Sequence, residues 1–290
     1  MIPPMLHSTH GPHPDEPHGR ADLHVHTPAS DGVSTVEEIL AFVLGQTQLD
    51  VVGIADHERV DAALAAREIA RARDLPFEVV VGEEVSTRGG HLLAVFIEER
   101  IPPLRSLRES IALVHEQGGL AIPAHPLFPY PMCTQTWMLR RLLASKDPRV
   151  RPDALEAFNP TTFGRPVHRR VVAFAAEHDM PAVGGSDAHE ASSVGKGWTT
   201  FPGSTAEELR AAILEGRTGW HGSFHGTAAQ LPTFTRQLRK YSRDTRAEVA
   251  GRIRRDGTGR DHGYPGGTRR PPIYDKGALR AETARDENRP

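Results

Sequence analysis

The sequence predicts an α/β fold with a parallel sheet that is either open or closed into a barrel. Over about 200 residues, short apolar segments typical of buried strands alternate with segments whose apolar residues recur at helical intervals. Thr-x-x-Glu and Ser-x-x-Glu pairs with the spacing of helix-capping boxes precede two of the helical segments. Polar residues that can bind metal ions follow the ends of most strand segments.

The expected strands cover residues 21–26, 50–55, 77–85, 91–97, 120–123, 153–158 and 181–184. Only five residues, Gly89 and Gly90 among them, separate the third of these strands from the fourth. A parallel crossover needs a dozen residues or more, so we expect these two strands to pair as an antiparallel hairpin. This hairpin places His91 close to Glu84.

The expected helices each carry an apolar stripe. Thr35 and Glu38 predict the capping box of the first helix, and Ser204 and Glu207 predict that of the last. The helices are expected over residues 36–44, 60–73, 104–117, 134–144, 165–178 and 204–215.

Charge divides the 290-residue chain into two unlike parts. Residues 226–290 contain 15 basic and 8 acidic residues, whereas the rest of the chain contains 20 and 29, so the overall net charge of −2 hides a basic tail. We expect a disordered leader over 1–20, one domain over 21–225 and a basic, largely disordered tail over 226–290, with a possible helix around 236–253. The tail is either simply solvated or a contact for nucleic acid.

Cysteine content and hydropathy exclude several classes of protein. The single cysteine, Cys133, rules out an internal disulfide framework and a cysteine-based zinc site. The sequence has no apolar run long enough to span a membrane, and its N-terminus lacks the apolar core of a signal peptide. We therefore expect a cytoplasmic protein without a membrane partner.

Nine residues that can bind metals stand at or near the ends of the predicted strands, where α/β folds collect their chemistry. His24 and His26 lie two residues apart and so share one strand face. The full set is His24, His26, Asp31, His57, Glu84, His91, His125, Asp187 and His189. Nine nitrogen and oxygen ligands are too many for one ion, but two or three ions that share a bridging carboxylate would use all of them. The mixture of imidazole and carboxylate favours Mn²⁺, Fe²⁺ or Zn²⁺ over Ca²⁺ or Mg²⁺.

The motifs that carry these residues occur in a characteristic order. They are Asp22-Leu23-His24-Val25-His26-Thr27 with Ser30-Asp31-Gly32, Ala55-Asp56-His57, Gly82-Glu83-Glu84, His91, Ala124-His125-Pro126 and Ser186-Asp187-Ala188-His189. Together they resemble the PHP (polymerase and histidinol phosphatase) family over residues 21–220. The resemblance covers neither the leader nor the tail. It implies a single PHP-type domain, a distorted seven-stranded (β/α) barrel with a trinuclear metal centre.

The resemblance also implies a ligand set for each ion. The sets are His24, His26, Glu84 and Asp187 for one ion, Asp31, His57 and His189 for a second, and Glu84, His91 and His125 for a third. Some family members carry histidine where Asp31 stands here. Members of the nucleotide-phosphatase and 5′-exonuclease type have an inserted domain between the positions of His91 and His125, but only 33 residues intervene in this chain. This departure weakens the transfer of their substrates and suggests a more open pocket.

These observations predict a phosphoesterase that acts on a small phosphomonoester, a nucleotide or an oligonucleotide. A hydroxide that bridges two ions would be the nucleophile, because a bound divalent ion lowers the pKa of water. Asp187 or His189 is the candidate for proton transfer. Arg165 and Lys196 are candidates for gripping phosphate, and Asn159 for binding substrate or orienting a ligand.

Two other functions stay open at this point. One is an amidohydrolase or lactonase at the same site, although such enzymes often use a carbamylated lysine, and here Glu84 takes the bridging position. The other is a non-catalytic, metal-stabilised module that contacts its partner through the basic tail. The sequence leaves the substrate, the metal and the oligomeric state undetermined.

Overall fold

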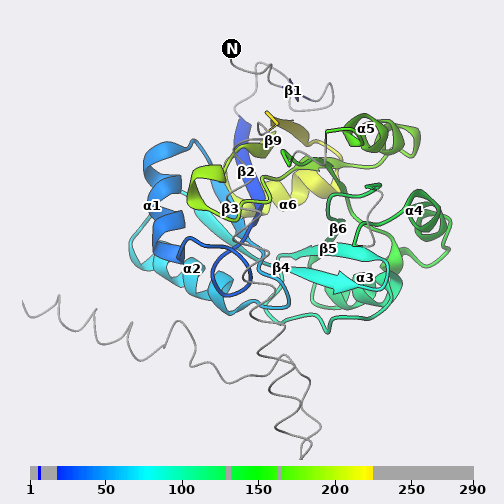
Figure 1. The fold of residues 1–290 in the computed structure, drawn as a ribbon, viewed down its shortest axis with the longest axis horizontal. Coiled ribbons are helices and arrows are strands. Elements are labelled where there is room, and N and C mark those ends of the chain that lie inside the picture. Colours follow the sequence, from blue (N-terminus) through cyan, green and yellow to red (C-terminus); the bar gives the residue numbers. More distant parts are fainter. Residues whose placement is uncertain (1–5, 8–17, 129–131, 162–164, 225–290) are drawn as a thin grey trace, which may run out of the picture. The chain divides into compact units, whose positions relative to one another are not determined.

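The fold is organised around a mixed β-sheet (Figure 1), described in a computed structural model over residues 6–7, 18–128, 132–161 and 165–224. The sheet contains β1 (Leu6–His7), β2 (His18–Val25), β3 (Val51–Ile54), β4 (Glu78–Thr87), β5 (Gly90–Val95), β6 (Leu120–Pro123), β9 (Gly197–Pro202) and β10 (Gly219–Gly222). Their order is β1-β10-β9-β2-β3-β4-β5-β6. A separate parallel pair consists of β7 (Leu155–Phe158) and β8 (Ala182–Gly184).

The direction of the strands corrects the expectation of a parallel sheet. β2, β3 and β4 are parallel, but β5 is antiparallel to both β4 and β6. The predicted hairpin between the third and fourth expected strands is confirmed, since the β4–β5 ladder runs from the Gly82–Val95 pair to the Thr87–Gly90 pair. Within the described residues, β6 has no ladder partner other than β5, so continuous ladders do not close the sheet into a ring. The fold is therefore α/β with a mixed sheet.

Two strands that we did not predict, β9 and β10, extend the sheet beyond β2. Their β-branched and aromatic residues, such as Thr199 and Phe201, are typical of strands and were the available signal. His18–Ala21 pair antiparallel with Thr199–Pro202. Because β2 therefore begins at His18, the expected boundary of the disordered leader at residue 20 is wrong.

The N-terminal and C-terminal segments are described only in part. Leu6–His7 form β1 and pair with β10, which contradicts a wholly disordered leader, whereas residues 1–5 and 8–17 lie outside the described residues. The predicted tail over 226–290, with its possible helix, also lies outside them. The chain divides into two units, Met1–Gln230 and Leu231–Pro290, and every described residue belongs to the first.

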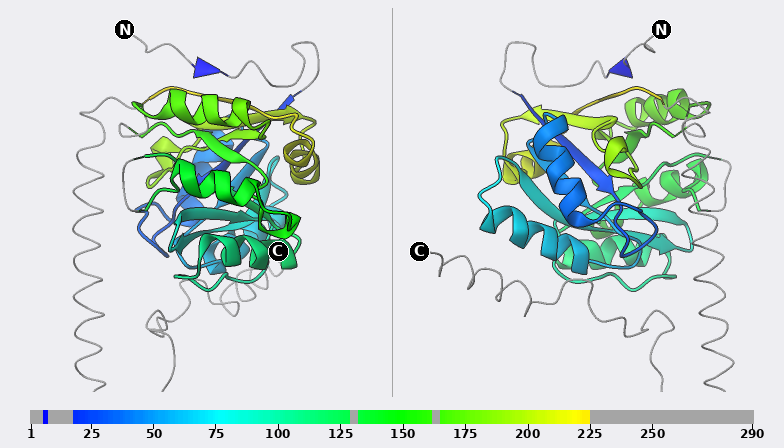
Figure 2. Two further views of the ribbon diagram at one scale, coloured as in Figure 1. Left: turned by 90° about the vertical axis from the view of Figure 1, so that its right-hand side faces the viewer. Right: turned by 60° about the vertical axis from the view of Figure 1, so that its left-hand side comes forward.

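The described helices are α1 (Val36–Gln46), α2 (Asp61–Ala72), α3 (Leu107–Glu116), α4 (Thr136–Leu143), α5 (His168–Glu177) and α6 (Ala206–Leu214), with short 3₁₀ helices at Pro148–Val150 and Ala191–Ser193. α1 to α5 lie around the outside of the curled sheet (Figures 1 and 2), whereas α6 is seen across its middle in Figure 1 and packs its apolar face on the central core. None of the described helices is long and apolar enough to cross a membrane.

The first residues and capping boxes of the helices agree only partly with the predictions. The capping box of Thr35 and Glu38 at α1 is confirmed. At α6 the box is formed by Thr205 and Glu208, one residue later than we predicted. The helix predicted from residue 104 begins at Leu107, because Leu104 has a positive φ of 58° that helical backbone excludes.

An apolar core fills the inside of the curled sheet and supports the strand ends. Leu23 of β2, Val80 of β4, Leu93 of β5, Ile122 of β6 and Phe201 of β9 are all buried in one cluster. Burying a side chain of this size stabilises the fold by about 1.5–3 kcal/mol. The core therefore holds fixed the strands whose ends carry the predicted metal ligands.

Candidate metal centre

His24, His26 and Glu84 form the most deeply buried part of a cluster of histidines and carboxylates, and we call these three residues the cluster floor. His24 lies at the end of β2, His26 just beyond it, and Glu84 lies in β4. Their side chains are 0%, 0% and 2% exposed. β2 and β4 flank β3 as parallel strands, so the path of the backbone brings their ends together.

The floor side chains and Asp187 surround a common point. His24 Nε2 lies 3.3 Å from Glu84 Oε2 and 3.5 Å from Asp187 Oδ1. His26 Nε2 lies 3.3 Å and 3.4 Å from the same two oxygens. Ligands that bind a tetrahedral ion at about 2.0–2.2 Å are separated from one another by about 3.4 Å. These four side chains are thus spaced as the ligands of one ion would be.

Glu84 faces two different groups of imidazoles with its two oxygens. In addition to the floor histidines, Oε2 faces His57 Nε2 at 3.4 Å. Oε1 lies 2.8 Å from His91 Nδ1 and 3.1 Å from His125 Nε2. A carboxylate placed in this way can bridge ions on its two sides.

Asp31 and His57 lie at the solvent side of the cluster, and we call them the cluster rim. Their side chains are 33% and 26% exposed. Asp31 Oδ2 lies 3.1 Å from His189 Nε2 and 3.9 Å from His57 Nε2. The structure therefore brings all nine predicted residues into one cluster that is buried at the floor and open at the rim.

Unpaired ring nitrogens provide a test of whether this cluster suits metal ions. Among the described residues, His24 Nε2, both ring nitrogens of His26 and His91 Nδ1 are buried and form no hydrogen bond of suitable geometry, although carboxylate oxygens lie 2.8–3.6 Å from them. Leaving a buried polar atom unpaired costs about 1–3 kcal/mol. Divalent ions bound by these lone pairs would remove that cost, and the set of imidazoles and carboxylates suits Mn²⁺, Fe²⁺ or Zn²⁺. The residues present therefore fit such ions.

Hydrogen bonds from Nδ1 of two histidines leave the Nε2 lone pair of each available for a metal ion. His24 Nδ1 lies 2.7 Å from Glu156 Oε1, and His189 Nδ1 lies 2.9 Å from the backbone oxygen of Asp187. Both oxygens are acceptors, so each Nδ1 carries a proton and donates it. Each Nε2 then presents a lone pair to the cluster, as a metal ligand must.

The carboxylates of the cluster control the charge of the floor histidines. Burial alone would lower the pKa of His24, but Glu156, Asp187 and Glu84 outweigh burial and raise that pKa well above its ordinary value. The same competition between burial and the nearby carboxylates of Asp187, Glu84 and Asp31 raises the pKa of His26 to about 10. Without cations, these imidazoles therefore bind protons, so protons and metal ions compete for the floor.

Burial wins over the carboxylates at His57 on the rim, whereas on Glu84 the charged partners again outweigh burial. Burial is the largest influence on His57 and lowers its pKa to about 4. Burial would raise the pKa of Glu84, but His91, His57 and His24 hold it well below its usual range. Glu84 is consequently ionised, and His57 is neutral near pH 7.

Two cluster residues have strained backbone conformations. His125 and Asp187 have positive φ values of 30° and 50°, which cost non-glycine residues on the order of 1 kcal/mol or more each. Gly185 meets a different constraint, because a Cβ atom there would lie 2.6 Å from Glu156 Oε1 and 2.9 Å from His24 Cβ. The chain near the cluster is therefore held in place by its surroundings.

The three residues predicted to contact substrate lie in different places. Asn159 Nδ2 donates to Asp187 Oδ2 at 3.3 Å and to Glu156 Oε2 at 3.2 Å, so it belongs to the cluster. The Arg165 guanidinium lies over the Phe224 ring, 5.4 Å from its centre.

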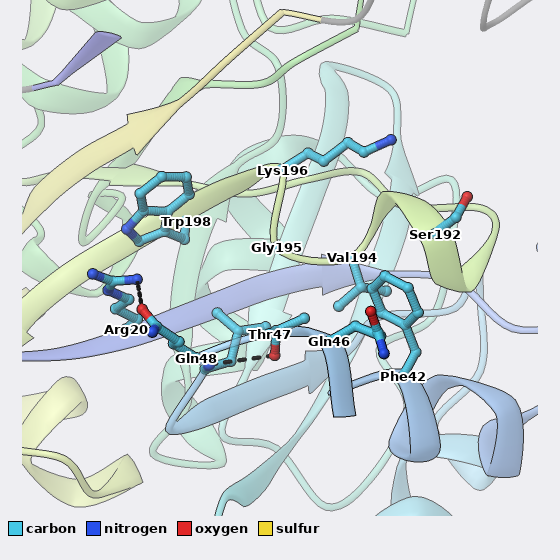
Figure 3. Close-up of a pocket in the computed structure, with 11 residues that line it drawn as sticks. Arg20, Phe42, Gln46, Thr47, Gln48, Ser192, Val194, Gly195, Lys196 and Trp198 are labelled. Carbon is cyan, nitrogen blue, oxygen red and sulfur yellow. Dashed lines mark hydrogen bonds between the residues drawn. The ribbon is translucent and has the colours of Figure 1, made fainter. Parts of the chain in front are cut away.

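Lys196 lines a pocket of about 270 Å³ that contains none of the nine cluster residues (Figure 3). The pocket lies between the segment after α1 and the loop before β9. Arg20 donates to Gln48 and lies over Trp198 there, 5.8 Å from its ring centre. Figure 3 shows the Lys196 side chain pointing away from this hydrogen bond.

Sequence reasoning missed Asp22, which precedes His24 on β2. One oxygen of Asp22 accepts from the backbone N–H of Ser186 at 3.0 Å, and the other accepts from that of Gly195 at 2.8 Å. Burial raises the Asp22 pKa to about 6. An Asp two residues before a ligand, on the same strand face, was the available signal.

Two neighbours of the ligands have clear structural partners. Asp56 accepts from the backbone N–H of Thr27 at 2.8 Å and from its hydroxyl at 2.6 Å, which supports the turn before Asp31. Cys133 Sγ lies 3.3 Å from His125 Nδ1, so it contacts a cluster residue that its sequence position did not reveal.

Comparisons with known proteins agree with this picture. A family model described as PHP-associated matches residues 166–218, which include Asp187 and His189. An uncharacterised protein of Methanocaldococcus jannaschii is 34% identical over 121 residues, which cover 38% of this chain and 69% of the relative. A 5′-3′ exoribonuclease of Haemophilus influenzae is 30% identical over 105 residues, 35% of this chain and 37% of that protein.

The fold has a counterpart among solved structures. A two-domain protein of Bacteroides vulgatus, containing a predicted PHP-like metal-dependent phosphoesterase, superposes with a TM-score of 0.58 at 18% identity. The match covers 78% of this chain and 72% of that one. The α/β fold and the cluster at its strand ends define the class as metal-dependent enzymes. Within that class, the chain belongs to the PHP family of metal-dependent phosphoesterases.

Proposed function

We propose that the protein hydrolyses phosphate esters at a trinuclear metal centre formed by the nine cluster residues. The proposed ligand sets are His24, His26, Glu84 and Asp187, then Asp31, His57 and His189, and finally Glu84, His91 and His125. The observation that carries this proposal is the position of Glu84, whose Oε2 faces one group of imidazoles and whose Oε1 faces another.

Bound divalent transition-metal ions would supply two kinds of chemistry here, activation of water at neutral pH and neutralisation of phosphate charge. Glu156 fixes the His24 tautomer through the 2.7 Å contact with Nδ1. Asp187 Oδ1 faces the floor histidines, whereas Oδ2 accepts only the 3.3 Å bond from Asn159 among its described contacts. We therefore assign proton transfer to Asp187 Oδ2, with His189 as the neighbouring candidate.

We also propose that the strands form a seven-stranded barrel, although continuous β-ladders do not join β6 to β7 or β8 to β2 among the described residues. Asp153 N, just before β7, donates to the oxygen of Ala121 in β6 at 2.9 Å. Val25 at the end of β2 forms a parallel bridge with Ala188, which follows β8. These contacts support a distorted ring that runs from β2 to β8 and back to β2.

The proposed substrate class includes nucleotides and oligonucleotides beside small phosphomonoesters. The relative that is a 5′-3′ exoribonuclease supports phosphodiester chemistry, and the partly exposed rim suits a phosphate at the end of a larger molecule. Arg165 and Lys196 are then candidates for contacts with substrate outside the cluster. The proposal also includes a cytoplasmic location and the division of the chain at residue 225.

The experiment combines metal analysis with two classes of substrate. The purified protein should contain two to three equivalents of Mn, Fe or Zn, and the His24→Ala/His26→Ala variant should lose at least one equivalent together with aryl phosphatase activity. His115→Ala is the matched control, because His115 pairs with Asp153 outside the cluster. Full metal and activity in the double variant would contradict the proposal, as would faster hydrolysis of amides or lactones than of phosphate esters.

A further inference from the structure

A recess of about 420 Å³ lies between the tip of the β4–β5 hairpin, the start of α3 and helix α4. Arg88 comes from the hairpin, Arg108 from α3, and Trp137 and Arg141 from α4. Leu107 and Met138 contribute apolar surface between them. We call this recess the arginine–tryptophan groove.

The groove has the chemistry of a site for an anionic, aromatic ligand. Its lining includes three arginines and no Asp or Glu. Trp137 is 61% exposed, and no large apolar side chain in the described part of the chain is more exposed. An exposed tryptophan beside several guanidinium groups offers a stacking surface together with phosphate-binding forks.

The guanidinium groups of the groove have exposed and exchangeable partners, which include a 3.1 Å hydrogen bond from Arg108 to Ser145 Oγ. Arg88 lies 3.7 Å from Glu109, and Arg108 lies 3.8 Å from Asp147. Both arginine side chains are more than half exposed, so these long ion pairs contribute little. Within the described residues, Arg141 has no ion pair. A phosphate can therefore replace the existing partners at little cost.

Both walls of the groove are continuous with the cluster. The hairpin that carries Arg88 also carries Glu84 and His91. Arg88 lies at the turn of this hairpin, where Thr87 pairs with Gly90 and Ser86 pairs with His91. The other wall begins at the segment before α4, where Met132 O accepts from His91 N at 2.9 Å and Cys133 contacts His125.

Close packing joins the two walls to each other. Any side chain at Gly89 would collide with Met138, and one at Gly90 would collide with Thr134. The hairpin tip therefore lies directly against the start of α4. This contact fixes the distance between the groove and the cluster.

We propose that the arginine–tryptophan groove binds single-stranded nucleic acid, with a base stacked on Trp137 and phosphates on Arg88, Arg108 and Arg141. A strand held in this way continues along the hairpin to the cluster, where one of its phosphates is hydrolysed. The proposal rests on the proposed function, because the cluster supplies the reaction. A recess of this size accommodates single bases, so duplexes are excluded from it.

The test measures binding of fluorescent oligonucleotides of about 12 nucleotides to the full chain by anisotropy, with non-hydrolysable phosphorothioate linkages. Single-stranded RNA, single-stranded DNA and duplex DNA are compared. Trp137→Ala should weaken single-strand binding by about tenfold, and Trp137→Phe should retain most of it. The Arg88→Ala/Arg108→Ala/Arg141→Ala variant should reduce the slope of log affinity against log salt by about 2.

Arg140→Ala is the matched control, because Arg140 lies on the same helix but pairs with Glu177 and does not line the groove. Since the basic tail is present in every variant, differences between variants report on the groove alone. Equal binding by Trp137→Ala and the unaltered protein would overturn the proposal. Binding of duplex DNA as tight as that of single strands would overturn it as well.

A second measurement separates this proposal from the proposed function. Hydrolysis of an aryl phosphate, which is too small to reach the groove, should be unchanged in the Trp137 and arginine variants. Absence of oligonucleotide binding together with normal aryl phosphatase activity would remove the groove proposal and leave the metal centre in place. If the protein bound oligonucleotides through the groove but had no phosphatase activity, the proposed function would be wrong and the groove would stand as a binding site.

Discussion

The floor and the rim of the cluster use the same kinds of side chain in opposite surroundings. His26 at the floor is fully buried among carboxylates and has its pKa raised to about 10. His57 at the rim is 26% exposed and has its pKa lowered to about 4. Glu84 Oε2 lies at a similar distance from both imidazoles. Asp187 lies beside His26 and adds a second carboxylate there, whereas at His57 burial outweighs the carboxylates.

This contrast separates two roles within one site. In the proposed metal centre, the floor would hold an ion with its buried charged groups, and the partly exposed rim would hold an ion that substrate can reach. Substitution of Glu84 should therefore affect the two ions whose proposed ligand sets share it, whereas a rim substitution should affect one.

Glu84→Gln is expected to have the largest effect. The variant keeps the shape of the side chain but removes the charge that faces both groups of imidazoles. We expect loss of at least two metal equivalents and a fall in aryl phosphatase activity of roughly 10³-fold. Metal content by mass spectrometry and kcat/KM measure this, and loss of a single equivalent would show that Glu84 serves only one group.

Asp31→Ala should have a smaller effect at the rim. Asp31 contacts His189, lies 3.6 Å from His26 Nδ1 and 3.9 Å from His57 Nε2, and none of its described contacts is with His24, Glu84 or Asp187. We expect loss of one equivalent with the others retained, and a loss of activity of about 10–100-fold. If metal content fell as far as in Glu84→Gln, the division into floor and rim would be wrong.

Proton release on metal binding tests the contrast in charge. With a pKa of about 10, metal-free His26 is protonated at pH 7 and must lose its proton to bind an ion, so binding at the floor weakens as pH falls. With a pKa of about 4, His57 is already neutral and releases none. Calorimetry in buffers of different ionisation enthalpy should show fewer released protons for His26→Ala and an unchanged number for His57→Ala. Equal changes in both variants would contradict this difference.

We expect the smallest effect from a substitution at His115, which pairs with Asp153 outside the cluster and serves as a reference. Their side chains, 19% and 15% exposed, pair at 2.8 Å, and the hydrogen bond to Asp153 raises the His115 pKa above its ordinary value. The resulting stability is fully present below the unfolded pKa of about 6.5 and is lost as pH rises through the higher folded pKa. His115→Gln should destabilise the protein by less than about 1 kcal/mol at acidic pH and by less at alkaline pH, as thermal unfolding would show. Metal content should stay unchanged.

Local sequence patterns predicted the positions of the strands better than the connections between them. His24, Glu84 and His125 could be expected at one edge because each follows or ends an apolar segment, and the structure brings them together. The hairpin of β4 and β5 was predictable from its short connection. β9 was missed because the prediction passed from the strand at 181–184 to the helix at 204–215 without assigning a strand between those two elements.

Contacts between distant residues were the part that the sequence did not reveal. The bond between His24 and Glu156 joins residues 132 positions apart, and no local pattern specifies it. The one-residue error in the α6 capping box arose because Ser204 and Thr205 are both good N-caps, and each has a glutamate three positions later. The roles of Arg165 and Lys196 in binding phosphate stay predictions. Such contacts depend on the shape of the substrate, which the pattern of strands and helices does not specify.

The Asp22 carboxylate accepts hydrogen bonds from both ends of the loop between Ser186 and Gly195. Ser186 and Gly195, its two backbone partners, enclose the residues that carry Asp187 and His189. A segment anchored at both ends to a single point on β2 can change in sequence between Glu190 and Val194 without transmitting the change to the ions. A substitution at the exposed Ser192 should therefore leave the positions of Asp187 and His189 unchanged.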